Sequence, residues 1–185
     1  MENLIWILVG VVVLAIFWLI AVYNGLITLK NRTDEAWSDI DIQLKRRYDL
    51  IPNLIETVKG YASHEQETLN QVVTARNSAM NQSGGIEEKA QAENALSSTL
   101  KSIFALSESY PDLKANQNFL KLQDELSDTE NKIQASRRFY NGNARDFNIK
   151  MQVFPNNLIV NLLKFKEFEF FEANNEEKKN IEVKF

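Results

Sequence analysis

The side chains with catalytic potential are few in this sequence, and they are scattered rather than paired. His64 is the single histidine of the chain, and Glu65 follows it directly. Adjacent residues of a helix point about 100° apart, and the sequence has no second histidine to complete a metal site. We therefore interpret His64 as a solvated or capping residue rather than as a metal ligand.

Charged side chains allow a structural explanation as well. Several carboxylates alternate with lysines in one stretch of helical periodicity: Glu125, Asp128 and Glu130 beside Lys121 and Lys132. Ion pairs on a hydrated helix face explain this pattern without catalysis. The basic cluster Lys45-Arg46-Arg47 could bind an anionic partner or a lipid headgroup, but three charges on a helix are more typical of a solvated face. We favour the solvated face.

Motifs for nucleotide and nucleophile chemistry are absent from the sequence, which contains no GxGxxG, GxxxxGK[ST] or GxSxG. The absence of cysteine excludes disulfides, zinc–thiolate sites and thiol catalysis. A net charge of −4 and a pI near 5.2 give no reason to expect nucleic-acid binding. We expect a non-enzymatic protein with no catalytic residue, cofactor, metal, small-molecule substrate or nucleic-acid partner.

The element that must position everything else is an apolar stretch near the N-terminus. Leu4 through Val22 contains no charged or amide side chain. As a helix it is about 29 Å long, enough to cross the hydrocarbon core of a bilayer. Aromatic rings lie near both ends, where they prefer the interface, and basic residues that can reach headgroups follow. We predict that the span includes Leu4, Trp6, Trp18 and Val22, with Tyr23, Lys30 and Arg32 as interfacial anchors.

A cleaved signal peptide is the main alternative to this anchor. The residues Met1-Glu2-Asn3 before the stretch are acidic rather than basic, and the apolar run is longer than a usual signal core. No small-residue cleavage site follows it, so we expect an uncleaved anchor. Basic residues follow the span and none precede it, which predicts an N-terminus outside and a cytosolic remainder.

Few proline and glycine residues occur in the chain, and several of them mark the expected helix boundaries. Three Pro and six Gly in 185 residues leave little room for a fold rich in strands and turns. Breaks at Pro52, Ser83-Gly84-Gly85, Pro111 and Pro155 separate four helical segments, about 26–50, 52–82, 86–110 and 113–154. These lengths predict an all-α protein in which the transmembrane helix precedes a long antiparallel up-down four-helix bundle and a short extended C-terminal tail. The predicted domains are residues 1–25 for the anchor, 26–155 for the bundle and 156–185 for the tail.

Two seven-residue repeats support helices with a left-handed supercoil. The first is Phe119, Leu126, Ile133, Tyr140, Phe147 and Phe154. The position three residues later changes from Leu122 to Thr129, Ser136, Asn143 and Lys150. That change fits a buried polar network or, as we favour, a partly exposed rim. The second repeat is Trp37, Leu44, Ile51 and Val58, and it passes through Pro52. A kinked continuous helix is therefore an open alternative to a turn at Pro52.

Aromatic residues gather in the C-terminal tail, where they are interleaved with charged residues, and Ile181–Phe185 alternates apolar and polar residues. Two short amphipathic strands around a polar loop fit this pattern. A tail that docks its aromatic rings on the bundle or on a neighbouring chain also fits, and we favour docking over disorder. The predicted oligomer contacts are Phe165, Phe168, Phe170, Phe171 and Phe185.

Several long motifs are distinctive. They are Tyr23-Asn24, residues 36–54, residues 58–65, Ala75-Arg76, residues 108–116, residues 122–126, residues 129–133, Arg137, Tyr140-Asn141, Phe147-Asn148 and Phe154-Pro155. In this order, and over nearly the whole length, the chain resembles the LemA family of bacterial membrane proteins.

The resemblance implies a single-pass protein of the bacterial inner membrane that bears a long antiparallel helical bundle. No catalytic residue can be carried over from the family. Relatives in magnetosome-forming bacteria suggest a part in membrane shaping, and relatives encoded beside membrane metalloproteases suggest an adaptor. We expect contacts with membrane lipids and a homo-oligomer that serves as a membrane scaffold. The alternative is an adaptor that binds another membrane protein, such as a membrane metalloprotease.

Overall fold

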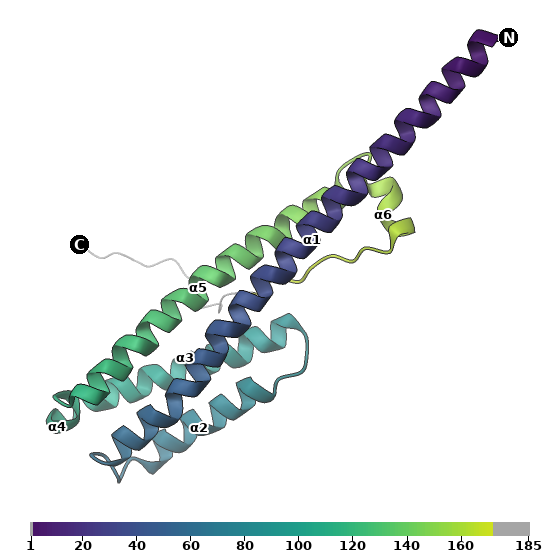
Figure 1. The fold of residues 1–185 in the computed structure, drawn as a ribbon. Coiled ribbons are helices and arrows are strands. Elements are labelled where there is room, and N and C mark those ends of the chain that lie inside the picture. Colours follow the sequence, from purple (N-terminus) through teal and green to yellow (C-terminus); the bar gives the residue numbers. More distant parts are fainter. Residues whose placement is uncertain (1, 172–185) are drawn as a thin grey trace, which may run out of the picture. The chain divides into compact units, whose positions relative to one another are not determined.

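The computed structural model describes residues 2–171, and every regular element in that range is a helix (Figure 1). The helices are α1 (Glu2–Lys59), α2 (Gln66–Asn81), α3 (Ile86–Ser107), α4 (Pro111–Lys114), α5 (Gln117–Gln152) and α6 (Asn157–Leu163). The predicted all-α class, with a long apolar helix at the N-terminus, is confirmed. The packing of the long helices into one up-down bundle and the predicted domain limits stay predictions.

Contacts divide the described chain into two compact units. Unit 1 combines residues 2–37 with Phe139–Phe168, and unit 2 combines Ser38–Arg138 with residues 169–171. Both long helices, α1 and α5, contribute residues to each unit.

Helix α1 runs without interruption through Pro52, so the predicted break at this residue is wrong and the alternative of a continuous helix holds. A proline lacks the N–H that would bond to the carbonyl four residues earlier, which here belongs to Tyr48. That carbonyl accepts a hydrogen bond from Nε of Arg76 on α2, at 2.8 Å. The neighbouring helix thus supplies the missing donor, and α1 continues to Lys59.

The helices of unit 2 end and begin at residues that favour turns or helix caps. After α1, residues 60–65 form the turn to α2. Helices α2 and α3 fold back on each other around Ser83-Gly84-Gly85, as the sequence predicted (Figure 1). Pro111 opens the single turn of α4. Asn116 then caps α5, because its Oδ1 accepts hydrogen bonds from the N–H groups of Asn118 and Phe119 at 2.9 and 3.0 Å.

The core of unit 2 is built from apolar side chains of four helices. The buried residues include Leu44, Ile51 and Val58 of α1, Val72 of α2, Leu96 and Ile103 of α3, and Phe119, Leu126 and Ile133 of α5. The members of both predicted seven-residue repeats that belong to unit 2 therefore point into its core. In the polar positions of the α5 repeat Thr129 is buried, whereas Ser136, Asn143 and Lys150 are half-buried, which agrees better with a rim than with a buried network.

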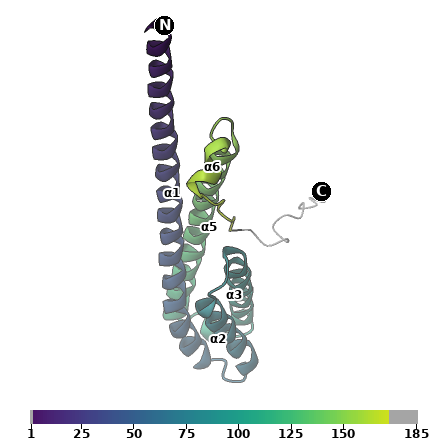
Figure 2. The ribbon, with the colours of Figure 1, turned by 90° about the vertical axis from the view of Figure 1, so that its right-hand side faces the viewer.

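Unit 1 joins the early part of α1 to the end of α5, to α6 and to the chain after α6. Its core consists of Val22, Leu26, Phe147, Met151 and Val160. The side chains packed against it are Trp18, Leu29, Leu163, Phe165 and Phe168. In both ribbon views the N-terminal part of α1 extends beyond α6 and the α5–α6 loop (Figures 1 and 2). This part is long and apolar enough to cross a membrane, judged by length and composition.

The tail begins as a helix rather than as extended chain, because Asn157–Leu163 forms α6. Phe154, the last residue of the α5 repeat, is exposed since α5 ends at Gln152. Residues 165–171 have no regular secondary structure, so the first of the two possible strands is absent. The second, Ile181–Phe185, lies outside the described residues.

Candidate functional site

The most concentrated polar chemistry in unit 2 surrounds the guanidinium of Arg47, which is 1% exposed. Its Nη1 donates hydrogen bonds to Oε2 of Glu130 at 2.6 Å and to Oγ of Ser97 at 2.8 Å. Its Nη2 donates to the carboxylate of Glu93, which is also 1% exposed, and to the Glu93 carbonyl at 3.4 Å. Arg47 thus connects α1 to α3 and α5. The prediction of a solvated face for Lys45–Arg47 is wrong at Arg47.

Tyr48 and Lys89 extend this network. The Tyr48 hydroxyl donates to the second carboxylate oxygen of Glu93. The Lys89 ammonium lies 5.7 Å from the centre of the Tyr48 ring and 3.9 Å from Glu93 Oε1. Burial raises the pKa of the Tyr48 phenol well above its usual range, and the hydrogen bond to Glu93 and its negative charge add to the shift.

Opposite charges are paired within the network. Two cations, Arg47 and Lys89, face two carboxylates, Glu93 and Glu130, and Tyr48 stays neutral. A buried charge is tolerated when it is paired and hydrogen-bonded, and removing one partner is costly. The arrangement therefore ties α1 to α3 and α5 through paired charges, while the partly exposed Glu130 also faces a groove between α3 and α5.

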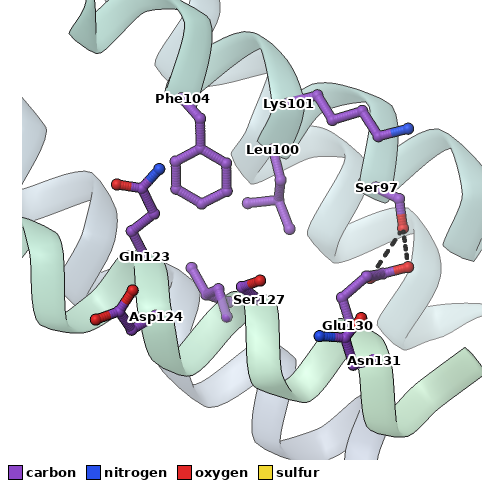
Figure 3. A pocket seen from close by; sticks show the side chains of 10 residues that line it. Ser97, Leu100, Lys101, Phe104, Gln123, Asp124, Ser127, Glu130 and Asn131 are labelled. Carbon is purple, nitrogen blue, oxygen red and sulfur yellow. Dashed lines mark hydrogen bonds between the residues drawn. The ribbon is translucent and has the colours of Figure 1, made fainter.

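A groove between α3 and α5 borders this network (Figure 3). Its volume is about 420 Å³, and Leu100, Phe104 and Leu126 supply apolar lining. Lys101 and Asp124 add opposite charges. At one side the Ser97 hydroxyl donates to the Glu130 carboxylate, at 3.3 and 3.4 Å from its two oxygens. The groove thus offers an apolar surface with charged neighbours.

The other residues with catalytic potential are separated. His64 is exposed in the turn between α1 and α2. Asp128 pairs with Lys132 at 2.8 Å, as predicted for a hydrated face, and the hydrogen bond from Lys132 holds the pKa of this carboxyl below its usual value. Glu130 differs from that prediction, since it pairs with buried Arg47. Among the described residues, no three His, Asp or Glu side chains are grouped to hold a metal ion.

The predicted span and anchor residues all belong to unit 1. Leu4 and Trp6 are fully outside the protein core, whereas Trp18 is half-buried and Val22 belongs to the core. The Tyr23 ring lies 6.3 Å from that of Phe165, Lys30 pairs with Asp34 at 2.6 Å, and Arg32 is exposed. Their membrane roles stay predictions.

The aromatic residues of the tail differ in their surroundings. Phe165 and Phe168 lie edge-on to Phe147 in unit 1, with ring centres 5.9 and 5.1 Å away. Phe171 is buried in unit 2, where the Arg137 guanidinium lies 4.2 Å from its ring centre. Phe170 is 41% exposed. Phe185 lies outside the described residues, and a role of any of these rings in an oligomer stays a prediction.

Asn148 was not singled out by the reasoning from residue chemistry, although it fixes the tail. Its Nδ2 donates to the Phe168 carbonyl, and its Oδ1 accepts from the Phe168 N–H, both at 2.9 Å. A single side chain thus satisfies both backbone groups of one residue, as a neighbouring strand would. Arg76 and Glu93 were missed in the same way. Arg76 and Asn148 do occur within the distinctive motifs.

Comparison with known proteins shows which family this chain belongs to. A model described as the LemA family matches residues 36–185. The chain is 29% identical to Protein LemA of Metamycoplasma hominis over 188 residues, which cover 98% of this chain and 84% of that protein.

More distant relatives are magnetosome proteins by name. The chain is 24% identical to Magnetosome protein MamQ 2 of Paramagnetospirillum magneticum, over 81% of this chain and 64% of that protein. It is 24% identical to Magnetosome protein MamQ of Magnetospirillum gryphiswaldense, over 80% of this chain and 64% of that protein. None of these names denotes an enzyme. Because the family model matches most of its length, the chain belongs to the LemA family.

Proposed function

We propose that this chain is a membrane-anchored, non-enzymatic helical scaffold that assembles with copies of itself and shapes the membrane. In this proposal α1 crosses the bacterial inner membrane with its N-terminus outside, and the remaining helices lie in the cytosol.

One observation carries the proposal, namely that the apolar helix leads directly into a packed core. Val22 closes the apolar stretch, and together with Leu26 it packs against Phe147 and Met151. The anchor and unit 1 are therefore one folded structure rather than two parts joined by a flexible linker. Such a connection suits a protein that holds a fixed position relative to a bilayer.

The relatives support a membrane role. The MamQ proteins are magnetosome proteins by name. This chain spans 64% of their length, so their role is carried to it only as part of the proposal.

Among the described aromatic residues of the tail, Phe170 is the strongest candidate for a contact between copies. The rings of Phe165, Phe168 and Phe171 contribute to packing within the chain, whereas Phe170 is exposed. We assign the assembly contact to Phe170.

The size of the purified full-length protein tests the scaffold, by electron microscopy beside light scattering. A regular ring or cage is the expected result, and a monodisperse monomer would contradict assembly. Phe170→Ser should reduce the particle size while helicity by circular dichroism stays unchanged. The matched control is Phe139→Ser, which changes an exposed Phe on α5 and should leave the size unaltered.

The groove between α3 and α5 favours a second candidate function, that of an adaptor for another membrane protein. A photo-crosslinking residue in place of Ser127, beside the groove, should then capture one distinct protein in cells. The same residue in place of Gln134, which is exposed on α5 outside the groove, should not. Capture of further copies of this chain at both positions would favour the scaffold instead.

A further inference from the structure

Large apolar side chains are exposed around the α5–α6 loop of unit 1. Phe154 is 78% exposed, Leu158 is 67% exposed and Leu162 is 81% exposed. Leu158 and Leu162 are four residues apart on α6, so they share one face of that helix. Val160 and Leu163 of the same helix pack on the core of unit 1. Helix α6 therefore has two apolar faces, and the protein covers one of them.

The position of this surface along α1 follows from contacts between α1 and α5. Trp37 lies against Tyr140, and Gly25 lies against the end of the Lys150 side chain. The two helices therefore run antiparallel in unit 1, and each residue advances both by about 1.5 Å. Met151, one residue before α5 ends, shares the core of unit 1 with Val22, so the loop that carries Phe154 begins close to where the apolar stretch of α1 ends.

The side chains beside the surface agree with a lipid interface. Trp18 is half-buried against the core of unit 1, to which Val160 of α6 belongs. It lies near the C-terminal end of the apolar stretch of α1, and tryptophan is enriched at membrane interfaces. Lys164 and Lys166, in the three residues after α6, are exposed. Lysines at such a position can extend their ammonium groups to lipid phosphates while their stems stay against apolar surface.

We propose that Phe154, Leu158 and Leu162 form a foot that inserts into the bilayer beside α1, at the cytosolic lipid interface. The occupant of this surface is lipid, because the surface continues the exposed apolar surface of the span at the depth where that span ends. The foot rests on the proposed membrane crossing of α1. It gives the protein a second, non-spanning contact with the bilayer, which fixes the rotation of α1 about its own axis.

Spin labels in the full-length protein test this foot, because the chain contains no cysteine and each introduced one is unique. The variants Phe154→Cys, Leu158→Cys and Leu162→Cys are labelled with a nitroxide and reconstituted in vesicles of phosphatidylcholine and phosphatidylglycerol. Accessibility to oxygen, which concentrates in lipid, is compared with accessibility to a water-soluble nickel chelate. Leu14→Cys is the control in the span, and Asp146→Cys is the control on the exposed surface of α5 in unit 1.

The foot predicts oxygen-to-nickel accessibility ratios several-fold above that of Asp146→Cys and below that of Leu14→Cys, because the ratio rises with depth and the foot lies at the interface. Ratios like that of Asp146→Cys at all three positions, with a lipid-like ratio at Leu14→Cys, would overturn the foot and leave the anchor intact. A water-like ratio at Leu14→Cys would overturn the anchor and the foot together. Exclusion of both reagents, with spin–spin broadening that disappears on dilution with unlabelled protein, would show a second copy on this surface and overturn the lipid contact.

Discussion

Two neighbouring arginines of α1 occupy opposite environments. Arg46 is half-exposed, and its nearest carboxylate oxygen, on Asp128, lies 3.8 Å away. Arg47 is buried among Glu93, Glu130 and Ser97. A weak exposed pair and a buried ion pair have very different effects on stability when one partner is removed.

We expect Arg47→Met to lower the free energy of unfolding by about 3–5 kcal/mol, because it leaves the Glu93 charge buried without its main partner. Urea unfolding of the detergent-solubilised protein, followed by circular dichroism, measures this. Arg46→Met should cost no more than about 1 kcal/mol. The double variant Arg47→Met/Glu93→Gln should recover part of the loss, and equal costs for the two arginines would contradict the network.

Tyr48 gives this network a dependence on alkaline pH. An unfolded tyrosine loses its proton near about pH 10, whereas the pKa of folded Tyr48 is raised above that value by burial and by Glu93. The raised pKa means that stability is fully present below the unfolded pKa and falls as the pH rises above it. Unfolding measured from pH 8 to 11 should show this fall, and Tyr48→Phe should reduce it.

Tyr48→Phe should also cost about 1–3 kcal/mol at neutral pH, because the Glu93 carboxylate loses a buried donor. Tyr61→Phe is the control, since this exposed hydroxyl accepts a hydrogen bond from Asn116 at the surface. Equal changes for the two variants would show that Glu93 does not depend on Tyr48.

The burial of Arg47 could have been predicted from the sequence. Leu44, Arg47, Tyr48 and Ile51 follow the spacing of one helical face, so an arginine and a tyrosine fall on the apolar stripe of α1. The residue that pairs with Arg47 could not be predicted from the sequence. Glu93 is distant in the sequence, and only the packing of α3 on α1 brings it to Arg47.

At the scale of elements, α1 shows how one tertiary hydrogen bond decides a helix boundary. The seven-residue repeat favoured a continuous helix, whereas the proline favoured a turn. The outcome depends on Arg76, whose Nε satisfies the carbonyl that Pro52 leaves without a donor. Breaks that depend on local turn chemistry, such as Ser83-Gly84-Gly85, were predicted correctly, and the break that depended on another helix was not.

A double-mutant cycle tests this explanation of α1. Arg76→Met should cost about 1–3 kcal/mol in unfolding free energy, because it leaves the Tyr48 carbonyl without a donor. In a Pro52→Ala background the cost should shrink, since Ala at this position supplies the helical N–H itself. Urea unfolding of the four proteins measures the coupling, and strictly additive changes would contradict the role given to Arg76.

At the scale of the whole molecule, the two units have separate apolar cores. Phe147 belongs to the core of unit 1, and Leu96 is buried in unit 2. The sequence predicted the helices but not this division, because the apolar repeats run through α1 and α5 without marking a change of unit.

A cavity made by mutation in one core should therefore speed hydrogen exchange of the backbone amides in that unit and not in the other. Phe147→Ala should destabilise its surroundings by about 3–5 kcal/mol, and Leu96→Ala should cost about 2–5 kcal/mol. Hydrogen exchange read by mass spectrometry should rise in unit 1 for the first variant and in unit 2 for the second. A uniform rise throughout the chain in both variants would show that the units unfold together.

The make-up of unit 1 has a consequence for synthesis on the ribosome. One part of unit 1 ends at Trp37 and the other begins at Phe139. Domains generally fold as they emerge, so the residues between these parts, which supply most of unit 2, are available for folding first. Val22 and Leu26 must wait for Phe147 and Val160, which are translated near the end of the chain. In the proposed membrane role, the anchor can therefore enter the bilayer before the residues that pack on Val22 and Leu26 have been synthesised.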